Sequence, residues 1–103
     1  MAKLYLTEYV GAGRYYGGSV PVADVGGWKE NAASPMTVSS GAVGSSIFST
    51  NTHLIRVHTD AIASIIVGPS PLTATANNAR LAANQTEYYY VEPGQILSVI
   101  ANT

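Results

Sequence analysis

The chain has 103 residues and a net charge of −1; 11% of its residues are charged and 47% are hydrophobic. This length suits one domain with a single core. The five lysines and arginines are scattered, which argues against the basic stripe of a nucleic-acid-binding protein. No apolar segment approaches the roughly 18 residues of a membrane span. From these two observations we expect neither a nucleic acid nor a membrane as a partner.

The low charge is the most informative feature of the composition, because an average soluble protein has roughly 25% charged residues. A nearly uncharged surface favours association, so we expect another molecule or another copy of the chain to cover part of it. A monomer with a Ser, Thr and Asn surface is the alternative. The sequence has no cysteine, so stability must come from the core or from oligomerisation.

The first predicted strand spans residues 3–10. Alternation with period two places Leu4 and Leu6 on one face and Tyr5 and Tyr9 on the other. The sequence before Glu8 has no apolar run of signal-peptide length. We therefore expect the chain to be made and kept in the cytosol, or assembled from there.

A glycine-rich region follows at residues 11–44, and within it only residues 19–25 and 36–40 look extended. Arginine and aromatic side chains on adaptable loops are typical of interfaces. They can equally cap an open end of a core, and the sequence leaves both interpretations open. The residues concerned are Arg14, Tyr15, Tyr16 and Trp28.

The strongest strand signal lies at residues 54–67, which predict two strands joined by a corner at residues 59–61. In the first strand, Ile55 and Val57 share one face while Arg56 and His58 share the other. The second strand, residues 62–67, is apolar and β-branched, as expected for a strand buried on both faces.

Shorter segments complete the predicted architecture. Residues 46–49, 80–82, 86–91 and 96–101 read as strands, residues 72–78 as a surface loop, and residues 84–85 and 93–94 as turns. No segment has helical periodicity. Six to eight short strands predict a single all-β domain, an antiparallel β-sandwich or barrel, in which residues 1–45 supply the N-terminal strand and glycine-rich loops, and residues 46–103 the core strands.

We predict no catalytic, metal or cofactor site. Gly11, Gly13 and Gly17 do not match the dinucleotide-binding spacing and no helix follows them. His53 and His58 are five residues apart on a strand, so their side chains project to opposite faces and cannot chelate one ion from that strand. A ligand from a second strand is conceivable, but exposed or hydrogen-bonded histidines are the favoured interpretation. No serine occupies a nucleophile elbow, and we expect the protein not to be an enzyme.

Three consecutive tyrosines lie in the predicted strand at residues 86–91. Tyr88 and Tyr90 share one face, while Tyr89 shares the other with Glu87. Exposed rings of this kind can stack on sugars, pack against a neighbouring subunit or form part of the core. Core or subunit packing is the favoured interpretation.

The sequence from Arg56 to Ile100, with its runs RVHTDAIASIIVGPSP, ATANNARLAANQTEYYYVEPGQ and ILSVI, resembles small structural proteins encoded among the head genes of tailed bacteriophages. The opening MAKLYLTEY is also similar to them. The resemblance implies a jelly-roll-like sandwich without a cofactor, made in the bacterial cytoplasm and located on the capsid surface as a decoration or cement protein.

The resemblance also implies partners, namely the major capsid protein and further copies of the chain in a homodimer or homotrimer. The alternatives are another virion position, in the neck, in the tail or beside a fibre, and a carbohydrate-binding β module. The predicted interface residues are Tyr5, Tyr9, Arg14, Tyr15, Tyr16, Trp28, Tyr88 and Tyr90.

Overall fold

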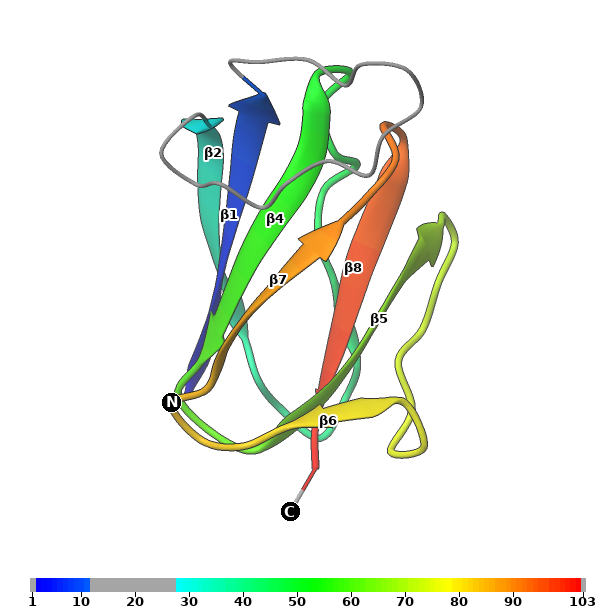
Figure 1. Ribbon diagram of the computed structural model, residues 1–103. Coiled ribbons are helices and arrows are strands. Elements are labelled where there is room, and N and C mark those ends of the chain that lie inside the picture. The colour runs from blue at the N-terminus through cyan, green and yellow to red at the C-terminus, as the bar shows by residue number, and fades with distance from the viewer. Residues whose placement is uncertain (1, 12–27, 103) are drawn as a thin grey trace.

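The protein is built from two antiparallel β-sheets (Figure 1). The computed structural model describes residues 2–11 and 28–102, and these residues contain eight strands and no helix. No helix that could cross a membrane is therefore present in these ranges. The strands are β1 (Lys3–Gly11), β2 (Trp28–Thr37), β3 (Val43–Gly44), β4 (Thr52–Thr59), β5 (Ala63–Pro69), β6 (Ala79–Leu81), β7 (Thr86–Tyr90) and β8 (Gln95–Ala101).

The strand pairing is nested. Sheet A has the order β2-β1-β4-β7 and sheet B the order β3-β8-β5-β6. The innermost pair is β5 with β6, and around it β4 pairs with β7 and β3 pairs with β8. The first strand, β1, lies between β2 and β4 and pairs antiparallel with both. Sheet A is therefore held together by a strand from the start of the chain.

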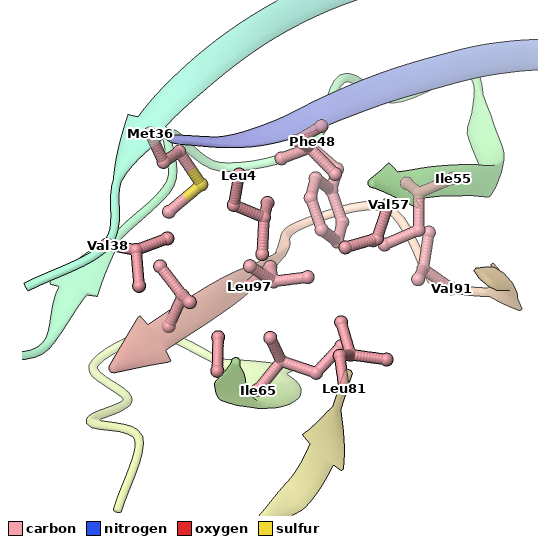
Figure 2. Close-up of a cluster of buried hydrophobic side chains, with 13 residues drawn as sticks. Leu4, Met36, Val38, Phe48, Ile55, Val57, Ile65, Leu81, Val91 and Leu97 are labelled. Atoms are coloured by element: carbon pink, nitrogen blue, oxygen red, sulfur yellow. The ribbon is translucent and has the colours of Figure 1, made fainter. Parts of the chain in front are cut away.

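One hydrophobic cluster lies between the two sheets, giving a sandwich-like arrangement. Figure 2 shows Leu4, Ile55 and Val57 of sheet A facing Ile65 and Leu97 of sheet B. Burial of these side chains is the main favourable contribution to folding. The cluster comprises Leu4, Leu6, Met36, Val38, Phe48, Ile55, Val57, Ala63, Ile65, Leu81, Val91, Leu97 and Val99.

A buried carboxylate shares the inner face of sheet A with these apolar side chains. Glu8 is 8% exposed, and its Oε1 accepts hydrogen bonds from the Thr52 hydroxyl at 2.6 Å and from the Ser49 backbone amide at 3.1 Å. Burying a charged group without such donors is costly. Among the described residues, no buried side-chain nitrogen or oxygen lacks a hydrogen-bond partner.

The outer face of sheet B is covered by the segment that joins β5 to β6, residues 70–78. The Ala74 amide donates to the hydroxyl of Ser98 at 2.9 Å. Asn102 Nδ2 donates both to the hydroxyl of Ser64, at 2.7 Å, and to the carbonyl oxygen of Ala76, at 3.1 Å. Both serines are fully buried, as is Ala74. Residues 72–78 form the predicted surface loop, and at Ala74 this loop packs on sheet B. Strand β5 is buried on both sides at Ala63, Ser64 and Ile65, as its sequence predicted, whereas Ile66 and Val67 are only half-buried.

The all-β prediction is confirmed, as are the alternating faces of β1 and β4. The turns at residues 84–85 and 93–94 are confirmed too, with φ of 62° at Asn84 and 87° at Gly94. Strand β2, by contrast, begins well before the predicted residues 36–40 and ends at Thr37, so residues 38–40 are not part of a strand. Its sequence, WKENAASPMT, has no alternation of apolar and polar residues. The strand is formed by backbone pairing with β1. The predicted strand at residues 19–25 lies outside the described residues.

The predicted strand at residues 46–49 is absent, and the short β3 at Val43–Gly44 was not predicted. The segment after β3 runs along β8 through separate hydrogen bonds. The Ser45 amide donates to the Leu97 carbonyl at 2.7 Å, and the Phe48 amide to the Gln95 carbonyl at 2.9 Å. These bonds do not form a continuous ladder. Phe48 is nevertheless in the core, while its neighbour Ile47 is 61% exposed.

Leu97 and Ile47 provide a matched test of where the core lies. Leu97 is fully buried at the centre of the cluster, so Leu97→Ala is expected to lower the free energy of unfolding by about 2–5 kcal/mol, through lost burial and the cavity it leaves. Ile47→Ala should change it by less than about 0.5 kcal/mol. Urea denaturation followed by circular dichroism measures both, and equal losses would contradict this assignment of the core.

Candidate functional site

The outer face of sheet A carries most of the described aromatic side chains that reach the surface. Because Leu4, Leu6, Ile55 and Val57 point into the core, the residues that alternate with them point outward. We call this surface the tyrosine face. It comprises Tyr5, Thr7 and Tyr9 of β1, Leu54, Arg56 and His58 of β4, and Thr86, Tyr88 and Tyr90 of β7.

The registers of β1 and β7 against β4 arrange these side chains in three rows across the strands. Side chains directly opposite each other on antiparallel strands lie close enough to interact. The rows are Tyr5–His58–Thr86, Thr7–Arg56–Tyr88 and Tyr9–Leu54–Tyr90.

Three tyrosines of this face are substantially exposed. Tyr5 is 42% exposed, Tyr88 41% and Tyr90 44%. They flank β4, on which Leu54 is only 1% exposed. Tyrosine offers a large apolar ring together with a polar hydroxyl, which is why it is enriched where proteins meet partners.

In the first row, the His58 side chain contacts both of its neighbours, Tyr5 and Thr86. The rings of Tyr5 and His58 have centroids 6.5 Å apart and are tilted by 41°. His58 Nδ1 and the Thr86 hydroxyl are 2.8 Å apart and share a hydrogen bond. A side chain held by such contacts loses less conformational entropy when a partner binds.

The charge on the tyrosine face is asymmetric. Arg56 is at its centre and half-buried, whereas the carboxylates of β1 and β7 lie on the opposite side of the sheet. Glu8 is bonded within the interior, and Glu87 accepts a hydrogen bond from Gln85 Nε2 at 2.7 Å. The three rows therefore contain an arginine and no carboxylate.

The structure places four of the eight predicted interface residues on this one face, namely Tyr5, Tyr9, Tyr88 and Tyr90. Trp28, predicted to be in a loop, instead begins β2 opposite Gly11. The other three, Arg14, Tyr15 and Tyr16, lie outside the described residues.

Sequence reasoning did not include Arg56 and His58 in the interface, although their alternation with Ile55 and Val57 already placed them on an outer face. The missing information was the register. Only the pairing of β4 with both β1 and β7 shows that these two side chains lie between the tyrosines.

A groove of about 260 Å³ lies on the side of the sandwich where β7 approaches β5 and β6. Its lining is mainly apolar, and among its residues Tyr89 is the one with a titratable side chain. It therefore offers a place for packing rather than for chemistry. The lining residues are Ile65, Ile66, Val67, Asn78, Ala79 and Tyr89.

In the described part of the chain, no group of three or more His, Cys, Asp or Glu side chains is arranged to hold a metal ion. No protein-family model matches the sequence, and comparisons with curated proteins and with solved structures found no match.

Tyr89 gives a pH-dependent signature of the packing at the groove. Burial raises the pKa of its hydroxyl above the ordinary value of 10.0, and the nearby charge of Glu87 raises the pKa further. A pKa raised by folding contributes stability below the unfolded pKa that is lost as pH rises through the folded pKa. The free energy of unfolding should therefore fall above about pH 10.

This fall should be smaller in Tyr89→Phe, which has no hydroxyl to ionise, and Glu87→Gln should lower the pKa of Tyr89. Urea denaturation at several alkaline pH values, paired with absorbance titration of the phenolate, measures both effects. Identical pH profiles for the wild type and Tyr89→Phe would contradict the assignment.

Proposed function

We propose that this protein is a structural component of a tailed-bacteriophage virion, bound to the outside of the capsid shell as a decoration or cement protein. The resemblance that supports this role covers Arg56 to Ile100, the part of the chain that contains the second half of β4, all of β5 to β7 and all but the last residue of β8. In this proposal the major capsid protein is the partner and the tyrosine face is the docking surface.

The observation that carries the proposal is the contrast between the two outer faces. Sheet B is covered by residues 70–78 of its own chain, whereas sheet A presents Tyr5, Tyr88 and Tyr90, each more than 40% exposed. Tyrosine and arginine are the residues most often responsible for binding energy at interfaces. A cement protein needs no catalytic group, and many copies of a modest interface give strong total binding.

We further propose that the sandwich is a jelly roll. A jelly roll is a long antiparallel hairpin rolled into two sheets, and the nested pairs β5 with β6, β4 with β7 and β3 with β8 have this order. Strand β1 takes the position beside β2 that a strand following β8 would occupy. The fold is then a jelly roll with its last strand supplied from the start of the chain.

Self-association as a dimer or trimer is part of the proposal. A chain with 11% charged residues has little charge repulsion to keep copies apart. Copies that meet at a local symmetry axis of the shell would each contribute one docking surface, so their binding energies would act together.

A sugar-binding role is the second candidate, because Tyr88 and Tyr90 are exposed on one face and their rings can stack on sugar rings. A panel of glycans that changes neither the fluorescence of Trp28 nor the behaviour of Tyr88→Ala would exclude it. A neck or tail position is separated from the capsid surface by copy number, since quantitative mass spectrometry of virions would then give tens rather than hundreds of copies.

The central test is sedimentation of the purified protein with undecorated mature capsids. The wild type should co-sediment in stoichiometric amount. The double substitution Tyr88→Ser with Tyr90→Ser should weaken binding by about 30-fold or more, because two exposed rings are lost from the centre of the contact. Titration of each protein against a fixed amount of capsid gives the affinities.

Ile47→Ser is the matched control, because Ile47 is more exposed than either tyrosine and does not belong to the tyrosine face. It should bind like the wild type. Absence of co-sedimentation by the wild type would overturn the proposal, and equal weakening by Ile47→Ser would overturn the choice of face.

A further inference from the structure

Arg56 specifies the chemistry of whatever covers the tyrosine face. It occupies the middle of the middle row, between Thr7 on one neighbouring strand and Tyr88 on the other. Its side chain is half-buried, and no ion pair to it is formed by a described carboxylate. In the protein alone, water can still solvate the guanidinium.

A partner that covers the three rows would remove this water. An arginine cannot become neutral, since its pKa is above about 12, and burying its charge without a partner costs several kcal/mol. Glu8 and Glu87, the carboxylates on the two strands that pair with β4, point to the other side of the sheet. Neither is placed to pair with Arg56, so a carboxylate of the partner would supply the compensating negative charge.

We propose that the tyrosine face binds a segment of a partner protein that places one aspartate or glutamate carboxylate on Arg56. The planar guanidinium can donate two parallel hydrogen bonds to a carboxylate. The exposed rings of Tyr5, Tyr88 and Tyr90 lie on the same face as Arg56, so they pack on the same segment of the partner and keep water away from that contact. This inference rests on the proposed function in taking the capsid as the source of the segment.

Two other occupants fit the charges less well. A second copy packed face to face about a two-fold axis through Arg56 would bring two arginines together, because such an interface is formed by the same patch on both copies, and like charges are unfavourable there. A nucleic acid or an acidic polysaccharide needs several cations to neutralise it, and the three rows contain one arginine. A single carboxylate in an otherwise weakly charged segment matches the face.

The test compares Arg56→Gln with Arg80→Gln in the capsid sedimentation assay. Arg80 is exposed on β6, in the other sheet, so its substitution makes the same change in net charge away from the tyrosine face. Arg56→Gln should weaken binding by about 30-fold or more, as expected when one member of a buried charge pair is removed. Arg80→Gln should bind within about twofold of the wild type.

A second arm of the test leaves the decoration protein unchanged. Amidation of the capsid carboxylates by a carbodiimide with glycinamide removes their charge. It should weaken binding of the wild type about as much as Arg56→Gln does, and weaken Arg56→Gln much less, because the two changes remove the same contact. Equal weakening of both proteins would overturn the inference.

The outcomes distinguish this inference from the proposed function. Wild-type protein that fails to bind capsids overturns both. Wild-type protein that binds, together with Arg56→Gln that binds equally well, overturns the carboxylate contact alone. A lower native mass for the Tyr88→Ser and Tyr90→Ser protein than for the wild type would show that a second copy covers the face, and would also overturn the inference.

Discussion

The position of β4 between β1 and β7 is the constraint on which the rest of the structure depends. Its two registers fix which residues of three strands face the core and which face outward. A slip by one residue on either side would exchange Leu6 or Glu87 with the exposed tyrosines. The apolar cluster and the tyrosine face are thus two results of one set of pairings, and the burial of Ile55 and Val57 stabilises both.

The sequence alone predicts the strands whose side chains alternate, because burial on one face leaves a period of two in the chain. Strands β1 and β4 show this, and β7 could be placed from its aromatic run. The extent of β2 could not be predicted, since its alanines, serine and proline carry no such pattern and its pairing comes from β1. The tyrosine face was predictable in the same partial way. The period of two puts Tyr5 with Tyr9, and Tyr88 with Tyr90, on one side of their strands, but it does not show that the two pairs share an outer face or that they meet around Arg56, because this depends on contacts between distant segments.

The two sheets deal with their outer faces differently, and the difference is chemical as well as geometric. The cover over sheet B is attached through small polar groups, the hydroxyls of Ser64 and Ser98, which satisfy buried donors of the covering segment and of Asn102. The outer face of sheet A instead carries the rings of the tyrosine face and the guanidinium of Arg56. Serines suit a permanent contact within one chain, while large side chains with polar ends suit a surface that meets both water and a partner.

The location of β1 also has a consequence for how the chain reaches its folded state. It precedes every other described strand in the chain, yet Leu4 pairs with Thr59, far along the chain. Until β4 has left the ribosome, β1 can pair only with β2, and the edge that β4 will occupy stays unpaired. Topologies dominated by such distant pairings fold slowly, and their exposed edges can associate with other chains in the meantime. Rapid synthesis of many copies would therefore put the greatest demand on protection of this short N-terminal segment.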